Sequence, residues 1–415
     1  MPKGWRERMS DLRGVEYLPE PTDRSMLSAV DPTVVDHEGS WRSEVMGWAP
    51  QQVRPVARTR RSSVTIGGLA LFALLVALGM VAWQNQWYVI ELPLPDSEWA
   101  YEATTVRDLQ EVGLSGQGVR LCMVDTGVDA SHEALKHVNI TFKDLIDGSA
   151  EPVDYGSVAH GTLMSGLLLS DMHQHGISPN VTFAMVAALR AGSDDANSGT
   201  DADVADAIRW CQFEFQADII SLSLGGSTAR VDEREGASSA ATRQATDAGV
   251  FVVAAAGNDG GPSDDGDVAS PGSARLAISV GATDRTGSLW DNSSTGSALD
   301  SNGELRASPH QKPEVVAPGV NIISTGDNNR WYSSSGTSDS TVFVAGTLAL
   351  LLEAYPHLKP QPGGSSACIE TVKTALMQSV DPNEPPGHDV HRGYGSLNAQ
   401  AWYEALAAAP MCTAS

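Results

Sequence analysis

The sequence predicts an α/β fold in which a parallel sheet carries helices on both faces, preceded by one transmembrane helix. Short β-branched runs alternate with segments of helical periodicity, an order typical of parallel strands joined by crossover helices. Gly, Asp, Asn or Ser bounds each run, as expected where strands end in turns. An uncharged apolar stretch near the N-terminus predicts the membrane span.

The predicted elements follow one another regularly after residue 118. Ligand sites of parallel sheets lie beyond the carboxyl ends of the strands, so polar residues at those ends are candidates for function. The strands are predicted at Val119–Val124, Val181–Leu189, Asp218–Leu224, Val250–Ala255 and Leu276–Val280. The helices are predicted at Gly161–Leu169, Asp203–Phe215, Ser239–Asp247 and Thr341–Leu352.

Composition excludes several classes of protein. The 415 residues are 41% hydrophobic, enough for one large domain with appendages. The chain carries 27 Lys and Arg against 51 Asp and Glu, and a net charge of -24 argues against a nucleic-acid partner. Four cysteines without a C-x-x-C pair exclude zinc ribbons and disulfide-dense scaffolds.

The membrane span is predicted from Val64–Trp83, VTIGGLALFALLVALGMVAW, which has no charged residue. At ~1.5 Å per helical residue this segment covers the ~30 Å hydrocarbon core of a bilayer. A buried core helix is the alternative, but such helices are rarely apolar on every side. Residues 64–83 are therefore expected to have the lipid bilayer as their partner.

The flanking residues predict the orientation of that span. The positive-inside rule places residues 1–63 in the cytosol, as a disordered tail, and residues 91–415 outside the membrane as the folded domain. Residues 64–90 then form a signal-anchor helix with an interfacial belt. Basic residues precede the span (Arg54, Arg58, Arg60, Arg61), and acidic (Glu91, Asp96, Glu98) and aromatic residues (Trp83, Trp87, Tyr88) lie at its far end.

Three polar residues lie where such a sheet would place chemistry. Asp125 ends an apolar run, His160 opens a helix, and Ser338 precedes the apolar helix Thr341–Leu352. Each has an ordinary structural alternative: a loop carboxylate, a polar helix start, and a helix N-cap. Each signal is weak when taken alone.

Together the three lie in motifs that resemble those of the subtilisin-like serine protease family. The family's chain order of Asp, His and Ser is kept, and the resemblance covers roughly residues 95–405. Five segments carry it: Val124-Asp125-Thr126-Gly127, His160-Gly161-Thr162, Ser223-Leu224-Gly225-Gly226, Ala255-Ala256-Gly257-Asn258, and Gly336-Thr337-Ser338 with Val344-Ala345-Gly346.

The resemblance implies a Rossmann-like sheet of the subtilisin type and hydrolysis of peptide bonds through an acyl-enzyme, without a cofactor or catalytic metal. Ser338 would be the nucleophile and His160 its general base, while Asp125 orients the imidazole. Asn258 would help to hold the oxyanion. The substrate backbone would bind along Ser223, Leu224 and Gly225, and the specificity pocket would be walled by Ala255, Ala256 and Gly257.

The serine motif departs from the family pattern directly after the nucleophile. The family usually has Met-Ala-Thr-Pro-His there, whereas this chain has Asp339-Ser340-Thr341-Val342-Phe343. A carboxylate at Asp339 would either oppose the developing oxyanion or point to solvent and favour the helix N-terminus. An inactive, peptide-binding module of the same fold therefore remains the alternative to an active enzyme.

Three smaller expectations complete the sequence analysis. Cys122 and Cys211 are interpreted as buried apolar residues, whereas Cys368 and Cys412 would form a disulfide in an oxidising exterior. The family's tight calcium site is expected to be missing, because Ala134 stands where relatives place a ligand Asp. The acidic loops Gly192–Asp203 and Asp259–Asp267 align with segments that border the groove in relatives and would favour cationic peptides; the alternative is a generally acidic, soluble surface.

Overall fold

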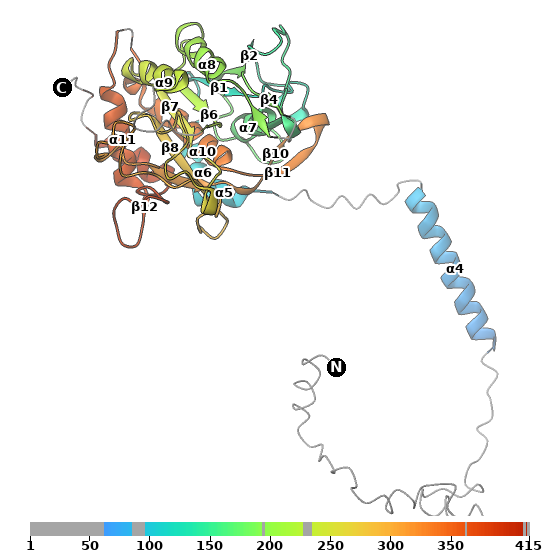
Figure 1. The fold of residues 1–415 in the computed structure, drawn as a ribbon. Coiled ribbons are helices and arrows are strands. Elements are labelled where there is room, and N and C mark those ends of the chain that lie inside the picture. The colour runs from blue at the N-terminus through green and yellow to red at the C-terminus, as the bar shows by residue number, and fades with distance from the viewer. Residues whose placement is uncertain are drawn as a thin grey trace, which may run out of the picture. The chain divides into compact units, whose positions relative to one another are not determined.

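The computed structural model describes residues 62–84, 96–192, 196–226, 235–361, 363–409 and 412. The chain forms two compact units, Met1–Leu92 and Pro93–Ser415 (Figure 1). The predicted cytosolic tail lies outside the described residues except for its last two, which begin a helix. The belt residues Trp87 and Tyr88 also lie outside them.

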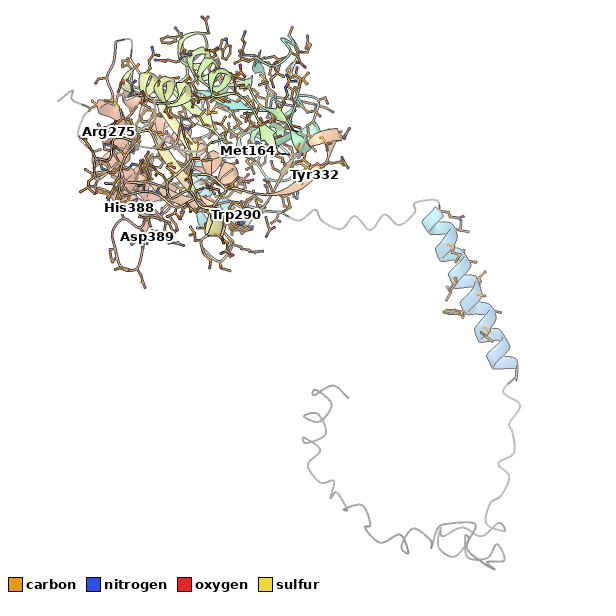
Figure 2. The ribbon with its side chains drawn as sticks, viewed as in Figure 1. Met164, Arg275, Trp290, Tyr332, His388 and Asp389 are labelled. Carbon is orange, nitrogen blue, oxygen red and sulfur yellow. A yellow bond between two sulfur atoms is a disulfide. The ribbon has the colours of Figure 1, made fainter. Side chains whose placement is uncertain are left out.

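The first unit contains helix α4 (Ser62–Gln84). Its described apolar side chains are exposed, as Figure 2 shows along the helix; examples are Leu69, Phe72 and Leu78. Over the side chains that the structure describes, no helix is both long enough and apolar enough to cross a bilayer.

The second unit is built on a nine-stranded sheet in the described part of the chain, in the order β12-β13-β9-β8-β7-β6-β1-β3-β2. Neighbouring strands are parallel except for β12 and β13 at one edge, which confirms the predicted α/β fold. The strands are β1 (Arg120–Asp125), β2 (Ile140–Asp144), β3 (Thr182–Ala187), β6 (Ile219–Leu222), β7 (Phe251–Ala255), β8 (Ile278–Thr283), β9 (Val315–Pro318), β12 (Asp381–Pro382) and β13 (Gly395–Ser396).

Helices cover both faces of this sheet. Alternate residues of each strand point to opposite faces, and in β1 the residues on both faces are apolar and packed against helices. In β1, Cys122 and Val124 belong to one apolar core with α8 (Asp201–Phe213) and α9 (Ala237–Asp247). Leu121 and Met123 belong to the other core. That second core is completed by α5 (Glu98–Ala103), α6 (Val106–Glu111), α7 (His160–Leu169), α10 (Thr337–Ala354), α11 (Ala367–Ser379) and α12 (Ala399–Ala407) (Figure 1).

Helix α10 is a long buried helix of this second core. All its residues from Thr337 to Leu352 are buried, and it contacts β6, β7, β8 and β9. A helix that is apolar on every side requires such an interior position. The helix therefore fixes its first turn, which holds Ser338, against the central strands.

Two disulfides lie in the second unit. Cys122 in β1 is bonded to Cys211 in α8, with 5.8 Å between the Cα atoms, and Cys368 is bonded to Cys412. Cys122 and Cys211 are buried, as predicted. The prediction that they are simple apolar residues is wrong, because they form a disulfide. The two side chains approach within the core between strand and helix, a proximity that neither segment reveals alone.

Smaller elements frame the sheet. A hairpin of β10 (Val320–Thr325) and β11 (Trp331–Ser335) runs into the start of α10. Strand β10 of this hairpin packs against α7, and Tyr332 of β11 is labelled in Figure 2. A second short pair joins β4 (Arg190–Ala191) and β5 (Asn197–Ser198).

Candidate active site

Asp125 and His160 meet at the carboxyl end of the sheet. Asp125 is the last residue of β1 and is fully buried, and His160 is the first residue of α7. The His160 Nδ1 lies 2.7 Å from Asp125 Oδ1, which also accepts the Thr126 N–H at 2.7 Å. A carboxylate at Nδ1 assigns the proton to that nitrogen and leaves Nε2 as the basic one.

Asp154 joins the two loops that carry this pair. Its Oδ1 accepts the Thr126 hydroxyl at 2.7 Å, and its Oδ2 accepts the Thr162 N–H at 2.8 Å and hydroxyl at 2.6 Å. Gly161 must be glycine, because a Cβ there would lie 2.0 Å from the Gly127 carbonyl oxygen. Sequence reasoning missed Asp154, although Thr126 and Thr162 stand inside the two motifs it connects.

Ser338 lies in the first turn of α10, and its hydroxyl is directed to a strand end. Its Oγ donates to the Ser223 carbonyl at 3.1 Å, and the Ser223 hydroxyl donates back to the Ser338 carbonyl at 3.1 Å. In this structure the Ser338 hydroxyl therefore donates to Ser223 rather than to His160. The sequence motif predicts Ser338 at a helix start, where it lies, but does not fix its rotamer.

Asn258 is held by the residue before the nucleophile. Its Oδ1 accepts the Thr337 N–H at 3.0 Å and the Thr337 hydroxyl at 2.8 Å. These bonds use the oxygen of the amide and leave its Nδ2 as a donor. The Nδ2 would lie 3.5 Å from a Cβ at Gly336, which places it beside the N-terminus of α10. Thr337 is a further residue that sequence reasoning did not single out.

These groups share one cleft of about 690 Å³. His160, Ser338 and Asn258 line it, together with Ser223, Leu224, Gly225, Ala255 and Gly257 of the predicted groove. Ala256 is the exception, because it is fully buried and bonded by its backbone to Val280 and Ala269. The remaining lining residues are Leu189, Asn197, Ser198, Gly199, Asp201, Val204, Gly226, Gly236, Ser238, Ser270, Pro271 and Thr337.

The arrangement contains the groups needed for nucleophilic acyl transfer. It combines a buried carboxylate, an imidazole oriented by it, an alcohol at a helix N-terminus, and an amide donor with its oxygen already engaged. Groups of these kinds, converging on one cleft, are the chemical set of a serine hydrolase.

Comparison with known proteins decides the family. Residues 116–395, 280 of the 415, match the model of the Subtilase family. The chain belongs to the subtilase family. It is a subtilisin-like serine endopeptidase.

Proteins similar to this subtilase include named proteases of Bacillus and one solved protease structure. Serine protease AprX of Bacillus subtilis (strain 168) is 31% identical over 327 residues, 72% of this chain and 70% of the relative. Subtilisin DY of Bacillus licheniformis is 32% identical over 257 residues, 60% of this chain and 82% of the relative. The solved structure of the prenylagaramide maturation protease PagA aligns with a TM-score of 0.57 at 26% identity, covering 72% of this chain and 98% of that one.

Asp339 of the subtilase is fully buried, so the expectation that it might point to solvent is wrong. Burial raises the pKa of this carboxyl to about 7. Burial by itself would lower the pKa of His160, but the negative charges of Asp125, Asp339 and Asp154 outweigh it and raise that pKa to about 9.

The two acidic loops of the subtilase differ in position. Residues of the first loop, including Asn197, Gly199 and Asp201, line the cleft, while Asp194 and Asp195 lie outside the described residues. Carboxylates of the second loop are engaged elsewhere: Asp259 accepts from Ser294, Asp264 from the Thr295 N–H, and Asp267 pairs with Arg306. Asp201 of the first loop is engaged as well, because it accepts the Ala237 and Ser238 N–H groups and the Ser238 hydroxyl. The preference for cationic peptides stays a prediction.

No group of three or more His, Cys, Asp or Glu in the described residues is placed to hold a metal ion. Ala134, at the position where relatives have a calcium ligand, lies buried in the short helix η2 (Glu133–Leu135). The missing calcium site stays a prediction for experiment.

Proposed function

We propose that this subtilase cleaves polypeptides through Ser338, His160 and Asp125. The observation that carries the proposal is the 2.7 Å contact between His160 Nδ1 and the buried Asp125, at the mouth of the cleft that also holds Ser338. An imidazole oriented in this way offers Nε2 as a general base toward the cleft. The nucleophile at the N-terminus of α10 supplies the second reactant.

The mechanism begins with rotation of the Ser338 side chain away from the Ser223 carbonyl. Its Oγ then attacks the carbonyl carbon of the scissile peptide bond while its proton passes to His160 Nε2. When the tetrahedral intermediate collapses, that proton moves to the leaving amine and an ester on Ser338 remains. Water then attacks the ester while His160 Nε2 takes its proton. The carboxyl product leaves, and His160 returns the proton to Ser338 Oγ, while Asp125 takes no proton and stabilises the imidazolium.

The oxyanion of that intermediate would be held by two donors. Asn258 offers its Nδ2, since its Oδ1 is bonded to Thr337, and the Ser338 N–H lies in the first turn of α10. Free N–H groups at a helix N-terminus favour a developing negative charge. The substrate backbone would lie along Ser223, Leu224 and Gly225, which line the cleft after the end of β6.

Peptide hydrolysis by the domain and its Ser338→Ala variant tests this function. The variant should lose hydrolysis by about 10⁶-fold, because the nucleophile is removed. Its thermal unfolding should hardly change, since only a hydroxyl in an open cleft is lost. Absence of hydrolysis by the unmodified protein from mildly acidic to alkaline pH would instead favour an inactive peptide-binding module.

We also propose that α4 anchors the protease in a membrane, with residues 1–63 cytosolic and the catalytic domain outside. The support is the uncharged sequence 64–83, which continues on both sides of the described α4 side chains, and the arginines before it. The two disulfides of the second unit are typical of an oxidising compartment, which agrees with an external domain.

Protease added to intact cells that express the full chain tests this orientation. Residues 91–415 should be digested and residues 1–63 spared, as probed with one epitope tag at each end. Disrupted cells serve as the control, in which both tags should be lost. Loss of the N-terminal tag alone in intact cells would reverse the topology, and recovery of the chain without membranes would refute the anchor.

A further inference from the structure

Two glycines line the cleft beside the reacting groups, one after β6 and one after β7. Gly225 lies two residues after Ser223, whose carbonyl accepts the Ser338 hydroxyl at 3.1 Å. Gly257 directly precedes Asn258, the proposed oxyanion donor. A substrate carbonyl at Ser338, with its oxygen toward Asn258, brings the side chain of that substrate residue to the gap between these two segments.

A third segment, formed by Ala269 and Ser270, closes this gap. The Ala269 N–H donates to the Ala256 carbonyl at 2.6 Å. Ser270 and Gly226 exchange two bonds from N–H to carbonyl, each of 2.9 Å. The Ser270 hydroxyl lies 2.7 Å from that of Ser239, which ties the segment to α9. The three segments therefore enclose a recess of the cleft with a fixed base.

The methyl group of Ala269 reaches both glycines of the recess. A Cβ added at Gly225 would lie 2.5 Å from Ala269 Cβ, and a Cβ added at Gly257 would lie 3.1 Å from it. Both distances are shorter than the ~3.5–4.0 Å of an ordinary contact between carbon atoms. The methyl thus lies against both walls and fills the base of the recess, so that a substrate side chain has to end short of it.

The chemistry of the recess is uniformly uncharged. A charged substrate side chain would lose its water there without an opposite charge among the enclosing residues. An aromatic side chain, which buries about 150–250 Å², needs more depth than an aliphatic one. The enclosing residues are Leu224, Gly225, Gly226, Ala255, Ala256, Gly257, Ala269 and Ser270.

We propose that Ala269 is a specificity-determining residue, whose methyl limits the recess to aliphatic side chains up to about the size of leucine and disfavours aromatic ones. The residue concerned is the one whose carbonyl is attacked. The inference rests on the function proposed above and deepens it, because it names the substrates as polypeptides cut after aliphatic residues. One methyl-sized group in such a recess changes kcat/KM by about 10–200-fold.

Hydrolysis of two peptides that differ only in this residue, leucine or phenylalanine, tests the proposal. The unmodified enzyme should cleave the leucine peptide with a kcat/KM about tenfold higher. Ala269→Gly removes the methyl and should raise the ratio of phenylalanine to leucine cleavage by about tenfold. Mass spectrometry of the products checks that the same bond is cut in each case.

Ala274→Gly is the matched control, because it removes a methyl group further along the same loop, where Ala274 packs against the core formed with α8 and α9. Its ratio of the two peptides should equal that of the unmodified enzyme. Preference of the unmodified enzyme for phenylalanine, or an unchanged ratio in an active Ala269→Gly enzyme, would overturn the proposal while leaving the serine-protease function intact.

Product peptides that end in leucine or phenylalanine give a second readout that needs no catalysis. Calorimetry with Ser338→Ala should show tighter binding of the leucine peptide, and adding Ala269→Gly should shift the preference toward phenylalanine. Tighter binding of the phenylalanine peptide by Ser338→Ala alone would overturn the proposal. Absence of hydrolysis by the unmodified enzyme, with the predicted order of affinities kept, would refute the proposed function and support the role of Ala269.

Discussion

The two halves of the active site are prepared to different degrees. In the first half, Asp125 and His160 are joined at 2.7 Å, and Asp154 connects the loops on which they stand. In the second half, the Ser338 hydroxyl donates to Ser223, and a buried carboxyl follows it in the chain. The base is thus preorganised, whereas the nucleophile has still to turn toward it.

The free energy needed to turn Ser338 from its bond with Ser223 toward His160 is small compared with the barrier of the reaction. Losing one neutral hydrogen bond costs about 1 kcal/mol, and a new bond to His160 would offset that loss, whereas enzymes typically lower reaction barriers by about 8 kcal/mol or more. Rotation of Ser338 is therefore a small step compared with the barrier that the site has to lower.

Asp125→Asn should break the prepared half and have the largest effect among the following variants. The amide offers an N–H where His160 needs an acceptor, so the wrong tautomer is favoured and kcat should fall by about 10⁴-fold. Steady-state hydrolysis at fixed pH measures this, with circular dichroism as a check of folding. A loss of less than tenfold would mean that the Asp125 contact is not part of the chemistry.

Asn258→Ala tests the other half and should lower kcat by about 10² to 10³-fold with little change in KM, because a transition-state donor is lost. Thr337→Val, which removes the 2.8 Å bond to Asn258 Oδ1 but keeps the donor, should cost less. An equal loss in both variants would indicate that the amide acts through local structure rather than through its Nδ2.

Asp154→Asn should loosen the connection between the segments that carry Asp125 and His160, without removing a catalytic residue. Asp154 accepts four hydrogen bonds, from Thr126 and the Gly156 N–H on one oxygen and twice from Thr162 on the other, and an amide keeps only one of these oxygens. The loosened alignment of His160 should lower kcat by about tenfold. Thr162→Val, which removes a single contact of the same carboxylate, is the matched milder variant. Unchanged kcat in both variants would show that Asp125 alone orients the imidazole.

The disulfide of Cys122 lies near the Asp125–His160 half of the site, because Cys122 is in β1 three residues before Asp125. Replacing Cys122 and Cys211 by alanine should lower the free energy of unfolding by about 2–5 kcal/mol. At low temperature kcat/KM should change less than twofold. Denaturant unfolding checks the first value, and a large loss of activity in the folded variant would contradict the second.

Much of the fold was predictable because its central strands are long, apolar and bounded by turn residues. β1 and β7 lie within one or two residues of their predicted ranges, and α7 begins at His160, one residue before the prediction. β9 was missed, since Val315–Pro318 is four residues long and ends in proline, and only its neighbours β8 and β13 define it.

That the candidate residues would lie close together was predictable, but their detailed contacts were not. The motifs place Asp125, His160, Ser338 and Asn258 in one cleft or at its edge because each stands at the end of a strand or the start of a helix. The Ser338 rotamer, the burial of Asp339 and the Asp154 brace arise from contacts between segments distant in sequence. No local pattern encodes such contacts.

Covalent labelling by a fluorophosphonate, followed by mass spectrometry of the intact domain and its peptides, tests the central claim most directly. The account predicts one adduct, on Ser338, that is absent in Ser338→Ala and strongly slowed in His160→Ala, because the prepared base activates that hydroxyl. An adduct on another residue, or labelling of Ser338 at an unchanged rate without His160, would contradict it.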